Sequence, residues 1–343
     1  MSTIKDIAKH TGLSLATISK YLNGGNVLAE NREKIDEAIE LLHYRINRSA
    51  RSLRSNHTKT VGVVMPTMAL AFFGSVFSEL DSVLTREGYT AIACSYNFNR
   101  ELEVDKFRYF ASNNVDGIVL IPQFLTAGEI DSIYSSVGRS FPIVLVDRTI
   151  PDFKCDTIVI DNLNAAYTSV EHLINQGHRR IGIIVGPQNI STAYERAVGY
   201  YRALKDYGLL DADYSSLAES RTENELVRIG NYDFESGFRI FNEFMDMDNP
   251  PTALCATNYD MTLGAISAAR ERRIVLGESI GFVGFDALNV CGMIRPQLCV
   301  VEQPTSDMGR CAGELLLKRM KGDSDGFPKV IRLKTQLHLE NEY

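Results

Sequence analysis

Residues 14–23 read Ser-Leu-Ala-Thr-Ile-Ser-Lys-Tyr-Leu-Asn, and this stretch has the pattern of a short amphipathic helix. Ser14 can cap its first turn, because a serine oxygen can accept the unpaired amide proton three residues along. Ile18 and Leu22 lie four residues apart and so share one face of the helix. The outer face is left to Leu15, Ala16, Ser19 and Lys20.

Two further helices are predicted beside this one. Upstream, Thr3-Ile4-Lys5-Asp6 offers a cap, and an apolar stripe follows until Gly12 breaks it. Downstream, residues 31–42 carry apolar side chains at helical spacing, which can close a small core. Two short helices joined by a glycine-containing turn indicate a helix-turn-helix, whose second helix lies in the DNA major groove. An ordinary helical hairpin is the alternative.

The front of the chain is also its only basic part. Between Tyr44 and Lys59 there are four arginines and a histidine and no acidic residue. Residues 1–60 hold ten Lys and Arg against six Asp and Glu, whereas residues 61–343 hold 26 against 37. This asymmetry favours phosphate neutralisation by the front segment, with a merely solvated basic linker as the alternative.

These motifs closely resemble the lactose-repressor/galactose-repressor (LacI/GalR) family of bacterial transcription regulators. The resemblance lies in residues 3–8, 14–23 and 44–53 and continues to about residue 340. It implies a DNA-binding domain over residues 1–46 and a hinge helix and linker over 47–59. In that family the hinge helix is ordered on operator DNA, and the leucine that matches Leu53 wedges between base pairs from the minor groove.

The resemblance also implies roles for single residues in DNA binding. Leu15, Ala16 and Lys20 match positions that touch base edges, and Ser14, Thr17 and Asn23 match positions that touch phosphates. The other expected DNA-binding residues are Thr3, Ser19, Asn47, Ala50, Arg51 and Leu53. Most relatives have arginine where Lys20 stands. Because lysine lacks the fixed fork of a guanidinium, we expect looser discrimination at that base pair.

Composition limits the class of protein. The 343 residues, 45% hydrophobic and 23% charged, suggest two or three ordinary soluble domains. Neither an apolar run of transmembrane length nor a signal-peptide pattern is seen, so we expect a cytoplasmic protein away from the membrane. The six cysteines show no CxxC pair and no histidine at ligand spacing, so we expect no metal, disulfide or cofactor.

From Thr60 onward, predicted strands and helices alternate. The strands are continuous apolar runs, which is typical of parallel sheets covered on both faces. The first strands fall at 61–65, 91–93, 117–121 and 143–146, and the helices between them near 72–86, 102–112 and 127–135.

The pattern then starts again. Residues 59–66 are echoed by 179–186, and residues 279–285 form a third such strand. We therefore expect an α/β fold of two doubly wound lobes with a ligand crevice between them. The resemblance implies the fold of periplasmic sugar-binding proteins, with chain crossings near Ile160, Glu302 and Phe327. The first lobe would take residues 60–160 and 303–327, and the second 161–302 and 328–340.

Charged residues follow several of these strands and are candidates for the crevice. Asp147 and Arg148 follow one strand, Asp286 ends another, and Arg196 lies in the helix after the strand at 181–185. In relatives, the residues that match Arg196 and Asp286 hydrogen-bond sugar hydroxyls. The full set expected to bind an effector is Phe72, Phe73, Asp147, Arg148, Thr192, Arg196, Tyr232, Asn258, Asp286 and Gln303. For each of them, a surface or lobe-linking polar role is the alternative.

Departures from the family pattern narrow the ligand. Leu70-Ala71 replaces a common Asn-Pro, and Tyr259 stands where an aspartate is usual. The purine-sensing branch has an aromatic where Arg148 stands and a basic residue where Ile190 stands, which argues against a purine. We expect a sugar or a sugar acid, with Arg148 and Arg196 able to hold a carboxylate or phosphate.

Three other classes of function would leave different marks on the sequence. The sequence has no GxSxG motif, P-loop or Rossmann fingerprint, although Asp147 and Asp286 could act as paired carboxylates of a glycosidase. A transport binding protein would need export, and a catabolite-control regulator would use a phosphorylated carrier protein as co-repressor. The favoured interpretation is a repressor that binds a pseudo-palindromic operator as a homodimer, since one head reads only a half-site.

Overall fold

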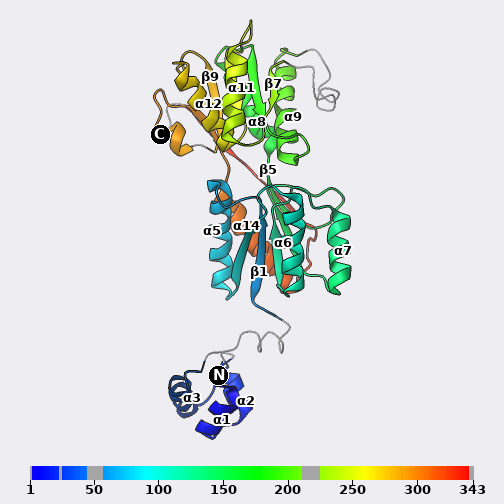
Figure 1. Cartoon of the computed structure of the whole chain (residues 1–343), viewed down its shortest axis with the longest axis vertical. Coiled ribbons are helices and arrows are strands. Elements are labelled where there is room, and N and C mark those ends of the chain that lie inside the picture. Colours follow the sequence, from blue (N-terminus) through cyan, green and yellow to red (C-terminus); the bar gives the residue numbers. More distant parts are fainter. Residues whose placement is uncertain (1, 23–24, 45–56, 211–224, 287, 340–343) are drawn as a thin grey trace. The chain divides into compact units, whose positions relative to one another are not determined.

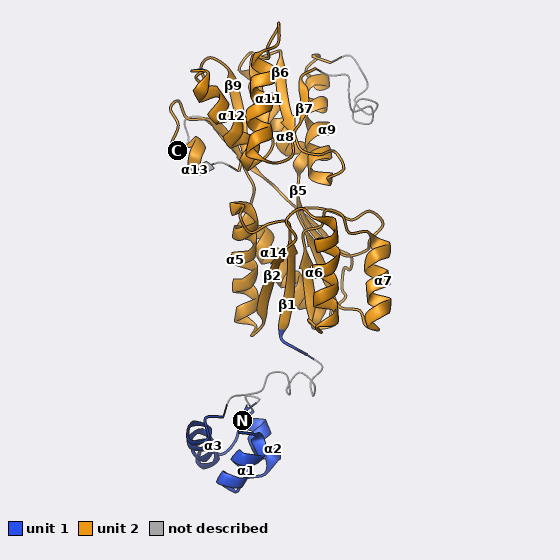
Figure 2. Cartoon of the chain, in the orientation of Figure 1, with its two compact units in different colours: residues 1–59 blue, residues 60–343 orange. Residues whose placement is uncertain are grey.

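The computed structural model describes residues 2–22, 25–44, 57–210, 225–286 and 288–339. The chain divides into two compact units, residues 1–59 and residues 60–343 (Figure 2). The expected hinge helix over 47–53 lies outside the described residues.

The described part of the first unit is a three-helix bundle. Its helices are α1 (Ile4–Thr11), α2 (Leu15–Leu22) and α3 (Ala29–Leu41). The Asp6 carboxylate caps α1 by accepting the Thr3 backbone N–H at 2.7 Å, and Gly12 ends it with φ +68°. Ser14 accepts the Thr17 N–H at 3.1 Å, as the sequence predicted. The fully buried core consists of Ile7, Ile18, Ile35 and Ala38.

Within the described residues of the second unit there are two sheets of six strands, each covered by helices on both faces (Figure 1). The first sheet is parallel throughout, in the order β11-β5-β4-β3-β1-β2. Its strands are β1 (Thr60–Met65), β2 (Thr90–Ser95), β3 (Gly117–Leu120), β4 (Ile143–Val146), β5 (Asp156–Ile160) and β11 (Val330–Leu333). The helices α5 (Ala71–Arg86) and α14 (Thr305–Met320) cover one face, and α6 (Arg100–Ser112) and α7 (Ala127–Val137) cover the other.

The second sheet repeats this plan in the order β12-β10-β9-β8-β6-β7. Its strands are β6 (Ile181–Val185), β7 (Val227–Ile229), β8 (Ala253–Ala256), β9 (Gly281–Phe285), β10 (Cys299–Glu302) and β12 (Gln336–His338). Of the strands described in this sheet, only β12 is antiparallel to its neighbour. The helices α8 (Asn162–Asn175) and α9 (Ser191–Asp206) cover one face, and α11 (Phe234–Met245) and α12 (Tyr259–Glu271) the other. The short α13 (Leu288–Cys291) follows β9.

The chain passes between the two lobes three times. The first passage joins β5 to α8 and the second joins β10 to α14, near the expected Ile160 and Glu302. The third lies at residues 334–335, between β11 and β12, and not near Phe327. Assigning residues 328–333 to the second lobe was wrong, because β11 pairs with β5 and the Asp156 carboxylate accepts the Lys329 N–H at 2.7 Å.

In the part of the chain that the structure describes, no helix has both the length and the apolar character needed to cross a membrane.

Candidate functional site

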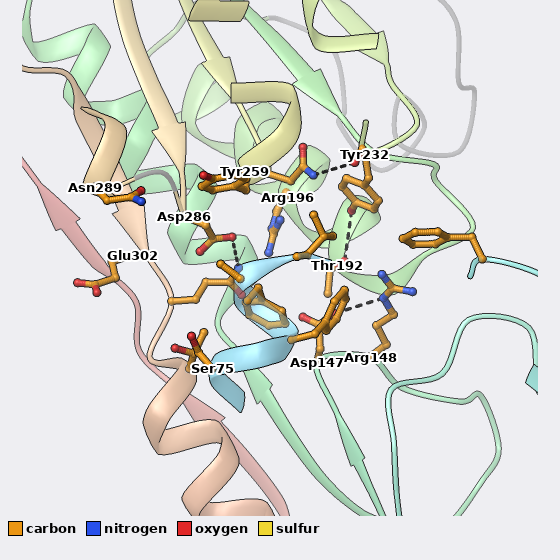
Figure 3. A pocket seen from close by; sticks show the side chains of 18 residues that line it. Ser75, Asp147, Arg148, Thr192, Arg196, Tyr232, Tyr259, Asp286, Asn289 and Glu302 are labelled. Atoms are coloured by element: carbon orange, nitrogen blue, oxygen red, sulfur yellow. Dashed lines mark hydrogen bonds and ion pairs between the residues drawn. The ribbon is translucent and has the colours of Figure 1, made fainter. Parts of the chain in front are cut away.

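A cavity of about 400 Å³ lies at the carboxyl ends of the strands of both sheets in the second unit. Figure 3 shows side chains from both lobes pointing into it. All ten residues that the sequence predicted for effector binding line this cavity: Phe72, Phe73, Asp147, Arg148, Thr192, Arg196, Tyr232, Asn258, Asp286 and Gln303. The structure therefore brings together residues that lie more than two hundred positions apart in the chain.

Each lobe contributes one aspartate from an equivalent turn. Asp147 follows β4 with φ +68°, and its N–H donates to the Ile158 carbonyl of β5 at 2.9 Å. Asp286 follows β9 with φ +60°, and its N–H donates to the Val301 carbonyl of β10 at 2.8 Å. A left-handed residue other than glycine costs about 1 kcal/mol or more, and such residues concentrate at functional sites.

Burial governs the charge of both aspartates. It raises the pKa of Asp147, against the opposing effect of Arg148, whose Nε lies 3.3 Å from an Asp147 carboxylate oxygen. It raises the pKa of Asp286 to about 6, although Arg196 and the Gln303 amide, which donates at 2.7 Å, favour the ionised form. The cavity thus holds two acceptor groups whose ionisation is costly, which suits hydroxyl donors on a ligand.

Arg196 is held on several sides. It is only 3% exposed, and its Nε donates to the Asn162 side-chain oxygen at 3.0 Å. One terminal nitrogen donates to the Thr257 carbonyl, and the guanidinium lies 4.8 Å from the centre of the Phe285 ring. A guanidinium has five N–H donors, so this buried group has further donors to offer to a ligand oxygen.

Aromatic rings form much of the remaining wall. Phe72 and Phe73 meet edge to face, with ring centres 5.1 Å apart. The Tyr232 hydroxyl lies 3.3 Å from the Thr192 hydroxyl, and the Tyr232 carbonyl accepts a bond from the Asn258 amide at 3.2 Å. A side chain at Gly186 would lie 2.1 Å from the Tyr232 ring, so only glycine permits this ring position.

Several cavity residues were missed by sequence reasoning. Ser75, Phe98, Asn289, Glu302 and Thr305 also line the cavity. Three of them lie on the helices α5, α13 and α14, Phe98 lies in a turn, and Glu302 ends β10. No spacing pattern marks them. The two departures noted in the sequence, Leu70-Ala71 and Tyr259, do lie in the wall.

In the first unit, the expected DNA-contact residues of α2 lie on one outer face. Leu15 is 45% exposed, and Ala16, Thr17 and Lys20 line a shallow hollow with residues 26–28 and Asn31. Tyr21 instead joins α2 to α3, because its hydroxyl donates to the Asp36 carboxylate at 2.6 Å. Asn23, Asn47, Ala50, Arg51 and Leu53 lie outside the described residues.

Two family models match the chain. Residues 3–47 match "Bacterial regulatory proteins, lacI family", and residues 170–339 match "Periplasmic binding protein-like domain". Among curated relatives, catabolite control protein A of Priestia megaterium is 31% identical over 324 residues, covering 94% of this chain and 93% of the relative. The HTH-type transcriptional repressor PurR of Vibrio atlanticus (strain LGP32) is 29% identical, covering 98% and 97%.

Solved structures show the same architecture over the whole chain. A complex of the transcriptional regulator CelR with cellobiose has 26% identity and a TM-score of 0.70, with all of both chains covered. A lac repressor dimer bound to operator and the anti-inducer ONPF has 21% identity and a TM-score of 0.83, covering 99% of this chain and 98% of the other, which shows the shared fold.

Proposed function

The chain belongs to the lacI family of bacterial regulatory proteins, and from this we propose that it is a transcriptional repressor whose operator affinity is set by a small sugar or sugar acid. The proposal rests on the presence of two features in one chain. The first is a helix-turn-helix with an exposed outer face, and the second is a cavity lined by Arg196, Asp147 and Asp286. The PurR relative is named as a transcriptional repressor and not as an enzyme.

The chemistry of the cavity supports a polyhydroxylated effector. Asp147 and Asp286 offer acceptors, Arg196 and Arg148 offer donors, and Tyr232 and Phe72 offer aromatic faces. This combination of apolar surface with a few convergent polar groups is typical of small-ligand sites. A relative solved with cellobiose supports the same class of ligand.

We further propose the DNA-binding roles of Thr3, Ser14, Leu15, Ala16, Thr17, Ser19 and Lys20. One head reads a half-site, so a homodimer on a pseudo-palindromic operator is the proposed functional unit. Residues 47–59 are proposed as the hinge and linker. The proposed location is the cytoplasm, where operator DNA is found.

The test begins with an operator selected in vitro from a pseudo-palindromic library. Fluorescence anisotropy would then follow binding at fixed salt during titration with sugars, sugar acids and nucleobases. We expect one sugar or sugar acid to change the operator affinity. A response to a nucleobase alone would contradict the proposed effector class.

A protein co-repressor is the second candidate, favoured by the similarity to catabolite control protein A. In that case none of the sugars, sugar acids and nucleobases would change the operator affinity, whereas a phosphorylated carrier protein would change it. If the protein bound the selected operator no more tightly than random DNA, both proposals would be contradicted.

A further inference from the structure

Asn162 is a buried amide next to the cavity residue Arg196, and both ends of its side chain form hydrogen bonds. Its oxygen accepts from Arg196 Nε at 3.0 Å, and its nitrogen donates to a Glu195 carboxylate oxygen at 2.9 Å. The residue is 1% exposed. It thereby fixes two consecutive side chains of α9, one of which, Arg196, points into the cavity (Figure 3).

The same residue stands directly after the first passage between the lobes. Asp161 donates its N–H to the Leu333 carbonyl of β11 at 3.0 Å, while its carboxylate caps α8 at the Asn164 N–H, 3.1 Å away. Residue 161 is therefore bonded to the first lobe through its backbone and to the second through its side chain. Asn162 is the next residue along.

A side chain of the first lobe closes this network. Arg332 of β11 donates to the Ile160 carbonyl at 3.2 Å and lies 3.8 Å from the Glu195 carboxylate. The polar contacts run from Arg332 through Glu195 and Asn162 to Arg196. They connect a strand of one lobe to the cavity wall of the other.

We propose that Asn162 is a positioning residue that holds Arg196 in place for the effector and ties it to the chain passage between the lobes. The inference rests on the proposed function in that Arg196 is taken to contact the effector. The Asn162 amide offers its oxygen as an acceptor to the donor-only guanidinium and its nitrogen as a donor to the acceptor-only carboxylate. An aspartate would face Glu195 with a like charge, and an alanine would leave both partners without this bond.

The first experiment needs no effector. In protein labelled with [15N]arginine, the Nε–H resonance of Arg196 is assigned by its loss in Arg196→Lys, and its exchange with solvent is measured. Because a hydrogen bond to a charged group is removed, we expect Asn162→Ala to speed this exchange by about tenfold or more. Arg148 Nε–H is the internal reference, and Asn164→Ala, an exposed asparagine of the same helix, is the matched control. The exchange of Arg148 Nε–H should stay the same in Asn162→Ala, and Asn164→Ala should leave the exchange of Arg196 Nε–H unchanged.

Glu195→Ala provides the second variant, because Glu195 is half-exposed and its removal frees the Asn162 amide to turn. We expect it also to speed the exchange of Arg196 Nε–H. The double variant should be no faster than Asn162→Ala alone, since both changes act through one amide. Unchanged exchange in both single variants, or fully additive effects, would overturn the proposal.

A functional measurement separates this inference from the proposed function. With cellobiose or another compound active in the operator assay, Asn162→Ala should move the half-maximal concentration upward by about tenfold. If no compound in the panel is active, the proposed effector class fails, while the exchange measurement still decides whether Asn162 positions Arg196.

Discussion

Asp286 shows how one residue of the cavity links ligand binding to stability. Its pKa of about 6 lies above the usual value for an aspartate, because desolvation of this carboxyl at the end of β9 penalises the charge. Such a group stabilises the fold fully below about pH 4, and that contribution is lost as the pH rises through 6. At pH 7 the ionised form costs up to about 3 kcal/mol.

We therefore predict that Asp286→Asn raises the melting temperature relative to the natural protein at pH 7 and has a smaller effect at pH 5. Asparagine tolerates the left-handed backbone of this position. Thermal unfolding followed by circular dichroism across this range would measure the difference. Asp152→Asn is the control, since Asp152 is an exposed aspartate with φ +59°. An equal shift at both pH values would contradict the role of burial.

Arg196 is the residue on which the effector response should depend. Arg196→Ala is expected to leave operator affinity unchanged and to abolish the response to an active sugar, because the buried guanidinium is in the cavity and not in the head. Anisotropy on the selected operator, with and without the sugar, would measure both quantities. If Arg196→Ala still responded to the sugar at the concentration that is effective with the natural protein, Arg196 would not be part of the effector site.

Which residues line the cavity could be predicted where a family motif marks them, as for Arg196, Asp286 and Tyr232. Asn162 could not, because its function depends on distances to α9 that no local pattern encodes. The left-handed conformation of Asp147 could not be predicted either, since glycine is the residue that usually signals such a turn.

Among the elements, the pair α5 and α14 depends on close approach of two backbones. A Cβ added at Gly309 would lie 2.3 Å from the Val76 carbonyl oxygen, which is backbone and cannot move aside. We predict that Gly309→Ala lowers the free energy of unfolding by about 1–3 kcal/mol. Chemical denaturation would measure the change.

The matched control is Gly74→Ala in α5, where an added Cβ meets nothing within 4 Å. Because glycine is a poor helix former, this change should stabilise the protein by about 0.5–1 kcal/mol. If both alanines had the same sign of effect, the close packing of α5 and α14 would not be what makes Gly309 necessary.

The long apolar strands and the helices between them could be predicted from sequence, and β3 and β4 match expectation closely. The strand β11 could not. It has only four residues with alternate ones exposed, so it lacks the continuous apolar run of a central strand. For that reason the third passage between the lobes was placed too early.

At the scale of the whole molecule, DNA binding should divide into a specific and a nonspecific part. Leu53, which lies outside the described residues, is the proposed minor-groove wedge. We predict that Leu53→Ala weakens operator binding by at least about tenfold and leaves binding to random DNA and its salt dependence unchanged. Anisotropy on both DNAs over a range of salt concentrations would measure this.

Leu102→Ala serves as the control, because Leu102 is an exposed leucine of the second unit. It should affect neither DNA. Equal losses on operator and random DNA in Leu53→Ala would contradict the wedge and would point to a general loss of phosphate contacts.

The repeated sheet plan has a consequence for how the protein is made. During synthesis, β5 leaves the ribosome long before its partner β11, and the buried Asp156 has to wait for Arg319, whose Nε lies 2.6 Å from it in the finished fold. The first lobe therefore cannot complete its sheet until almost the entire second lobe has emerged. Although it begins first, its last strand, β11, emerges only just ahead of β12, the last strand of the second lobe. A nascent chain halted before residue 319 would therefore expose the Asp156 carboxylate without its arginine partner and an open edge of the first sheet.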